Sequence, residues 1–117
     1  MTRPILVVDD DALMQRLIQL TLTKAGYDVI LTANGAVGLE IARTREPGLI
    51  RLDLWMPVMD GWEFLRVYYA SPGPHAGVIV CSVQRPTRSA LPSRVSFISQ
   101  PFHIGQLLDS VRQHLLP

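Results

Sequence analysis

Short apolar runs alternate with longer amphipathic segments along most of this chain. The continuous apolar run at residues 5–8 is typical of a strand buried on both faces of a sheet. Similar runs predict four more strands, at residues 29–31, 49–52, 78–81 and 95–99. Apolar residues at helical spacing predict helices at residues 12–25, 36–45, 61–69 and 104–116. Strands alternating with helices favour an α/β fold with a parallel sheet and helices on both faces.

The first and last predicted helices have readable apolar repeats. In the first, Leu13, Leu17 and Leu20 recur at helical spacing, Asp11 can cap the start and Gly26 suits a left-handed end. The last helix has one continuous stripe, made of Ile104, Leu107, Leu108, Val111 and Leu115.

Carboxylates follow two of the predicted strands. Asp9 and Asp10 come directly after the run at 5–8, and Asp53 comes directly after the run at 49–52. In open parallel sheets the ligand lies beyond the carboxyl ends of the strands, so these side chains are expected in one crevice. Like charges held this close repel and raise one another's pKa. The arrangement therefore suits a divalent cation or a phosphoryl-accepting carboxylate.

Composition narrows the class of protein. The chain has 117 residues, 48% of them hydrophobic, which is enough for one domain spanning residues 1–117. A formal charge of +1 gives no global field for nucleic acid or for an anionic membrane. No apolar run approaches the roughly 20 residues of a membrane span, and the start does not read as a signal peptide. With Cys81 as its single cysteine, the chain is expected to be cytoplasmic.

Four motifs together give the chain a family resemblance. They are residues 7–11, residues 52–61 with their Met-Pro and Asp-Gly pairs, residues 80–82, and the Pro-Phe pair at 101–102. The pattern resembles the receiver domain of two-component response regulators over nearly the whole chain. The resemblance implies a three-layer, flavodoxin-like sheet of five parallel strands in the order 2-1-3-4-5.

The resemblance also implies site roles. Asp53 corresponds to the phosphoacceptor, and a Mg²⁺ ion would be held by Asp53, by Asp10 directly, by Asp9 through water and by the backbone carbonyl of Trp55. Mg²⁺ prefers hard oxygen ligands and retains several waters, which fits this set. Ser82 corresponds to the hydroxyl that bonds the phosphoryl group, and it is a switch residue together with Phe97.

The implied function is acceptance of a phosphoryl group on Asp53 from a histidine kinase or a histidine phosphotransfer protein. The signal would then pass to an unknown downstream protein through protein contacts, with the chain a monomer or weak dimer. Such a protein assists its own phosphorylation and dephosphorylation but is not an enzyme in the usual sense. If the chain is complete, it has no room for an output domain.

The chain departs from the family at three places. Gln100 stands where the family has a lysine, so the phosphoryl group would lose a compact charge; we expect Mg²⁺ binding to persist and coupling to the distant face to weaken. Pro86 and Pro92 leave room for a fourth helix of only about one to one and a half turns between residues 82 and 94. Arg51 lies inside a strand expected to be central, where its long side chain is expected to snorkel to water.

Two other functions remain open from the sequence. Gln100 and the reduced fourth helix favour an interaction module that keeps the acidic pocket but signals without phosphorylation. A Mg²⁺-dependent phosphohydrolase with an aspartate nucleophile usually needs an acid/base carboxylate two residues later, where this chain has Trp55. A nucleic-acid role is least favoured, since no recognition helix is left over and the net charge is small.

Overall fold

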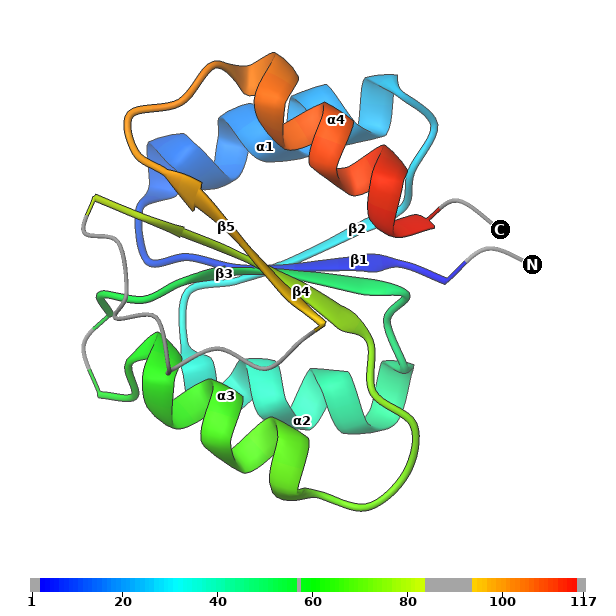
Figure 1. Cartoon of the computed structure of the whole chain (residues 1–117), viewed down its shortest axis with the longest axis vertical. Helices are drawn as coiled ribbons and strands as arrows, with labels where there is room; N and C mark the ends of the chain where they lie inside the picture. Colours follow the sequence, from blue (N-terminus) through cyan, green and yellow to red (C-terminus); the bar gives the residue numbers. More distant parts are fainter. Residues whose placement is uncertain (1–2, 57, 84–93, 116–117) are drawn as a thin grey trace.

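A five-stranded parallel sheet forms the centre of the protein, seen in a computed structural model that describes residues 3–56, 58–83 and 94–115 (Figure 1). The strands are β1 (Ile5–Val8), β2 (Val29–Thr32), β3 (Leu49–Asp53), β4 (Gly77–Ser82) and β5 (Val95–Ser99). The helices of the described residues are α1 (Ala12–Lys24), α2 (Gly35–Arg45), α3 (Gly61–Ala70) and α4 (Ile104–Leu115). The predicted α/β class and most predicted bounds are confirmed to within a residue or two.

The strand order is β2-β1-β3-β4-β5, as the family resemblance implied. β1 pairs in parallel with both β2 and β3, so that Val8 lies opposite Thr32 on one side and Leu52 on the other. The connection from β1 runs outward to β2, and the chain then returns past β1 to β3. The carboxyl ends of β1 and β3 are therefore neighbours at the point where the strand order reverses, which is where such sheets bind ligands.

Among the described residues, helices cover both faces of the sheet (Figure 1). α1 and α4 lie on one side, over a core that includes Ile18, Leu107 and Val111. α2 and α3 lie on the other side, where Phe64 packs into the second core. The apolar stripe predicted for the last helix is confirmed, because its members either are buried or pack against the α1–α4 core.

The apolar repeat predicted for the first helix faces water instead of the core. Leu13, Leu17 and Leu20 are 83%, 47% and 57% exposed. The buried residues of α1 are Ile18 and Leu22, which form an adjacent stripe one turn apart. A helix can turn only one stripe toward a sheet, and in α1 this second stripe packs against the sheet and α4. The three leucines are an exposed apolar stripe on α1.

The short fourth helix predicted between residues 82 and 94 falls largely on residues 84–93, which lie outside the described residues. From Ser82 the next described element is β5, which pairs in parallel with β4 along its whole length. None of the helices in the described part of the chain is long and apolar enough to cross a membrane.

Candidate functional site

Three carboxylates meet at the carboxyl edge of the sheet. Asp9 and Asp10 follow β1, Asp53 is the last residue of β3, and the two strands pair side by side. One carboxylate oxygen from each residue lies within 4.8 Å of the others. Asp9 is buried, Asp53 is half-buried and Asp10 is exposed. The predicted gathering of these side chains in one place is therefore present in the structure.

Hydrogen bonds fix both the backbone and the side chain of Asp9. Its backbone N–H donates to the Thr32 carbonyl at 3.0 Å, and its carbonyl accepts from the Gln15 side-chain amide at 2.7 Å. Its Oδ1 accepts the backbone N–H of Asp11 at 2.8 Å. Asp11 in turn caps α1, because its carboxylate accepts from the Leu13 and Met14 amides. The loop between β1 and α1 is thus fixed around Asp9.

Arg51 is the partner of the second Asp9 oxygen. Its guanidinium Nη1 forms an ion pair with Oδ2 of Asp9, and the Arg51 side chain is completely buried. The expectation that Arg51 would snorkel to water is therefore wrong. Alternate residues of a strand point to the same face, so Arg51 and Asp53 share the face toward α1 and α4. Since β1 lies alongside, Asp9 is within reach and supplies the counter-charge.

Asp53 carries the perturbed carboxyl group of the site. Burial raises its pKa above the ordinary value, and the nearby charges of Asp9 and Asp10 act in the same direction. Its Oδ1 accepts the backbone N–H of Trp55 at 3.2 Å, which lowers the pKa, as does the charge of Arg51. The net effect is a carboxyl that holds its proton more tightly than a solvated aspartate.

The segment after β3 fixes the position of Asp53. The side chains of Leu54 and Met56 are buried, whereas Trp55 between them is 52% exposed. Gly61 opens α3 directly against this segment: its N–H donates to the Leu54 carbonyl at 2.9 Å. A Cβ atom at position 61 would lie 2.7 Å from the Asp53 carbonyl oxygen, so glycine is required here for close approach.

Ser82 and Gln100 meet at the ends of β4 and β5. Ser82 is completely buried, and its carbonyl accepts the Gln100 backbone N–H at 2.8 Å. Asp53 pairs with Cys81, so Ser82 lies one residue beyond the strand position opposite Asp53. Phe97 is partly buried in β5 and packs against the α2–α3 core. The predicted site residues thus lie at or near the carboxyl ends of the strands, whereas Phe97 lies in the middle of β5.

The donor set suits a hard divalent cation. Its clustered ligand atoms are carboxylate oxygens, which Mg²⁺ accepts in near-octahedral geometry while keeping several waters. Both Asp9 oxygens already have partners, so Asp9 is better placed to contact a hydrated ion than to bind it directly. Asp10 and Asp53 are the more accessible members of the set.

Comparison with known proteins decides the family. The model of the response regulator receiver domain matches residues 5–112. This chain belongs to that family. The chemotaxis protein CheY of Bacillus subtilis is 31% identical over 120 residues, covering 98% of this chain and 99% of that protein. The receiver domain of the Francisella response regulator 1452 superposes with a TM-score of 0.87 at 25% identity, covering 97% and 96% of the two chains.

Other relatives are longer than this receiver. The alkaline phosphatase synthesis transcriptional regulatory protein PhoP of Bacillus subtilis is 44% identical over 63 residues, which cover 54% of this chain and 26% of that protein. The match therefore spans about a quarter of such a relative. Receiver domains as a family bind Mg²⁺ at an acidic pocket and interact with histidine kinases and phosphotransfer proteins.

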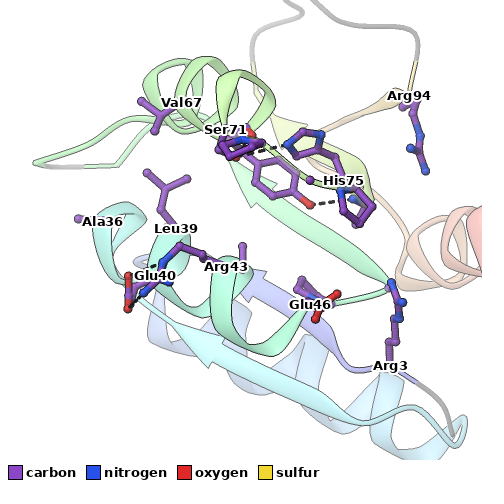
Figure 2. A pocket seen from close by; sticks show the side chains of 18 residues that line it. Arg3, Ala36, Leu39, Glu40, Arg43, Glu46, Val67, Ser71, His75 and Arg94 are labelled. Carbon is purple, nitrogen blue, oxygen red and sulfur yellow. Dashed lines mark hydrogen bonds and ion pairs between the residues drawn. The ribbon is translucent and has the colours of Figure 1, made fainter.

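The receiver also has a cavity of about 570 Å³ between α2 and α3, which reaches the amino-terminal ends of the strands (Figure 2). Arg3 and Gly48, which precede the starts of β1 and β3, line it, so it lies far along the strands from Asp53. Charged and polar groups on its wall pair locally, as Figure 2 shows for Glu40 with Arg43. The carboxylate cluster is not part of this cavity.

Arg51 is the site residue whose role sequence reasoning missed. The signal was present, because a charged residue two positions before Asp53 must share its face in a buried strand. What was lacking was the partner. The structure supplies it through the register of β1 against β3, which pairs Val7 with Arg51 and brings Asp9 within reach of the guanidinium.

Proposed function

We propose that this receiver accepts a phosphoryl group on Asp53 from a phosphohistidine of a histidine kinase or phosphotransfer protein. The observation that carries the proposal is the approach of three carboxylates to within 4.8 Å at the switch point of a receiver fold. Such a cluster destabilises the folded state by charge repulsion, and a divalent cation relieves that repulsion. We take residues 1–117 as one receiver domain, a phosphoacceptor and not a turnover enzyme.

In the transfer step, an unprotonated oxygen of Asp53 attacks the phosphorus atom of the donor. The new O–P bond forms as the P–N bond to the donor imidazole breaks, and the bonding pair stays on the ring nitrogen, which takes up a proton from water. The product on this chain is an acyl phosphate. The raised pKa of Asp53 means that more of the carboxyl is protonated at mildly acid pH than in a solvated aspartate.

The proposed ion site consists of Asp10 and Asp53 as direct ligands, Asp9 through water and the Trp55 backbone carbonyl. When bound, Mg²⁺ would neutralise charge on the transferring phosphoryl group. Asp9 would contribute from a fixed position, because its backbone and both carboxylate oxygens are already anchored.

Ser82 and Gln100 are proposed to border the phosphoryl group. A serine hydroxyl can donate one hydrogen bond, and a glutamine amide can donate two but carries no charge. Phe97 is proposed as the aromatic residue that responds to phosphorylation. Because it packs in the α2–α3 core, a change of its rotamer would be felt on that side of the sheet.

The exposed apolar stripe on α1 is the proposed contact for the phosphodonor. Leu13 begins it only two residues after the Asp11 cap, next to the carboxylates, and Leu17 and Leu20 continue it away from them. Leu17→Glu should slow transfer from a phosphotransfer protein. It should leave labelling by acetyl phosphate unchanged, because that donor needs no docking surface.

Mass spectrometry after incubation with Mg²⁺ and acetyl phosphate tests the proposed function. We expect one added phosphoryl group on the wild type and none on Asp53→Asn. Asp109→Asn, an equivalent change on the exposed face of α4, is the matched control and should be labelled like the wild type. Failure of acetyl phosphate and of several phosphorylated histidine kinases to label the wild type would refute phosphoryl acceptance.

A phosphorylation-independent interaction module is the second candidate. The ion pair between Arg51 and Asp9 already neutralises one carboxylate, and Gln100 offers no cation to a phosphoryl group. For this candidate, Asp53→Asn would leave partner binding unchanged, whereas a phosphorylation-driven receiver would lose the phosphorylated form's affinity.

A further inference from the structure

Arg51 is a buried cation directly beneath the acidic cluster. It sits in the middle of β3, with Val7 and Ile79 as its strand neighbours on either side. Its side chain is completely buried and reaches Asp9, the most buried of the three carboxylates. A charge in such a position needs a partner, and Asp9 provides one.

The guanidinium is only partly satisfied by this contact. Its Nε and Nη2 atoms have no hydrogen-bond partner among the described residues. The Cys81 thiol interacts with it electrostatically, but sulfur is a weak acceptor. Arg51 is therefore held mainly by its charge interaction with the cluster. Its field extends to Asp53, whose carboxylate it stabilises.

Arg51 changes the charge that an incoming ion meets. Three carboxylates alone carry a formal charge of −3, and with the Arg51 guanidinium the cluster carries −2. A guanidinium is protonated at any ordinary pH, so this reduction is permanent. Gln100, at the position where the family resemblance places a lysine, contributes no charge.

We propose that Arg51 is the resident counter-cation of this receiver, moved from the end of β5 to the interior of β3, and that it opposes Mg²⁺ binding. The inference rests on the proposed ion site. Because Arg51 neutralises Asp9 and occupies its Oδ2 atom, the cluster tolerates its own repulsion without metal. The same contact weakens the attraction for a divalent ion. Arg51 is a positioning residue for Asp9 and sets the metal affinity of the site.

The test is a Mg²⁺ titration followed by the fluorescence of Trp55, in a Trp62→Phe background so that one indole reports. Arg51→Met keeps an unbranched side chain as far as the position of Nε and removes the charged end of the guanidinium. We expect it to bind Mg²⁺ roughly tenfold more tightly or better, because an opposing unit charge a few ångströms away is gone. Its melting temperature should also rise more steeply with Mg²⁺ than that of the wild type. Arg51→Lys, which keeps the charge, should bind Mg²⁺ like the wild type.

Arg16→Met is the matched control. It removes the same charge from the exposed side of α1 and should leave the affinity unchanged. An affinity of Arg51→Met within twofold of the wild type overturns the inference, and so does an affinity weaker than that of the wild type. If the wild type shows no Mg²⁺ signal, a signal from Arg51→Met supports the inference and its absence overturns it.

Folding gives a second readout if Arg51→Met is unfolded without metal. Recovery of a cooperative melting transition on adding millimolar Mg²⁺ supports the inference, since the ion then replaces the lost cation. If Mg²⁺ does not restore the transition, the ion does not replace the lost cation and the inference is overturned.

These results are separable from the proposed function. The titration uses Mg²⁺ alone, whereas the proposed function depends on phosphoryl groups counted on Asp53. A wild type that is never phosphorylated, combined with tighter Mg²⁺ binding in Arg51→Met, would refute phosphoryl acceptance and keep the role of Arg51. Normal phosphorylation with unchanged Mg²⁺ affinity would do the reverse.

Discussion

Gly61 is the position where one methyl group should disturb both the fold and the site. It begins α3 immediately beside the end of β3. A Cβ atom there would lie 2.7 Å from the Asp53 carbonyl oxygen and 2.7 Å from the Leu54 Cα, and both are backbone atoms that cannot rotate away. Gly61→Ala therefore forces α3 and the end of β3 apart.

The size of the effect follows from these contacts. Ordinary van der Waals contact for a Cβ atom begins at 3.4 Å, so the two backbones must separate by about 0.7 Å. Overpacking of a rigid core usually destabilises by about 1–3 kcal/mol, and immovable neighbours place this case near the upper end. The hydrogen bond from the Gly61 N–H to the Leu54 carbonyl would also lengthen. We expect a loss of about 3 kcal/mol, or roughly 10 °C in melting temperature.

Urea unfolding of Gly61→Ala gives the free energy directly, with Gly105→Ala as the matched control. Nothing lies within 4 Å of a Cβ atom built at Gly105, which is in the first turn of α4. That variant should gain a few tenths of a kcal/mol, up to about 1, from helix propensity. Gly61→Ala should also bind Mg²⁺ more weakly, because Asp53 moves with its backbone. A Gly61→Ala protein within about 0.5 kcal/mol of the wild type would refute the close-approach reasoning.

Three further outcomes are expected. Asp11→Ala should lose about 1 kcal/mol in urea unfolding through loss of the α1 cap, whereas Asp11→Asn, which can still accept the amides of Leu13 and Met14, should keep most of the wild-type stability. Burial raises the pKa of Asp53, so the stability contribution of this carboxyl is present at low pH and is lost as the pH rises through its folded-state pKa. Asp53→Asn should therefore be more stable than the wild type at pH 7 in EDTA, and the difference should shrink toward pH 4. An equal difference at both pH values would contradict this expectation. Cys81 is completely buried and its thiol pKa is raised by that burial, so a disulfide reagent should modify it only at the rate of unfolding, and rapid modification of the native protein would show that the strand is open.

The sequence predicted the carboxylate cluster because two simple rules combine there. Asp9, Asp10 and Asp53 each follow an apolar run, and parallel strands bring such ends to one edge. A continuous apolar run predicts a strand buried on both faces. In the structure, every residue of β1 is inaccessible to water. The apolar runs that predict β1 and β3 therefore also predict where the carboxylates lie.

The apolar repeat of α1 does not by itself show which side of the helix is buried. Two stripes of similar hydrophobicity lie side by side on this helix, and periodicity cannot say which one the sheet covers. Tertiary contacts with α4 select Ile18 and Leu22, leaving Leu17 exposed. The decision depends on the partner layer, which lies far away in the sequence.

Arg51 and Gln100 show that the effect of a missing motif residue depends on charges elsewhere in the fold. At Gln100 the sequence shows the loss of a cation, and by itself that loss predicts a more repulsive acidic pocket. The interaction energy between charges depends on their distance in space. Arg51 is far from Asp9 in the sequence, but the two side chains form a direct ion pair in the folded protein. A lysine placed at residue 100 would meet a cluster that already holds one buried guanidinium. Gln100→Lys on its own should therefore lower the Mg²⁺ affinity, because the pocket would then hold two cations. Combined with Arg51→Met, it would give a pocket whose single cation is the lysine at residue 100, as in the family pattern.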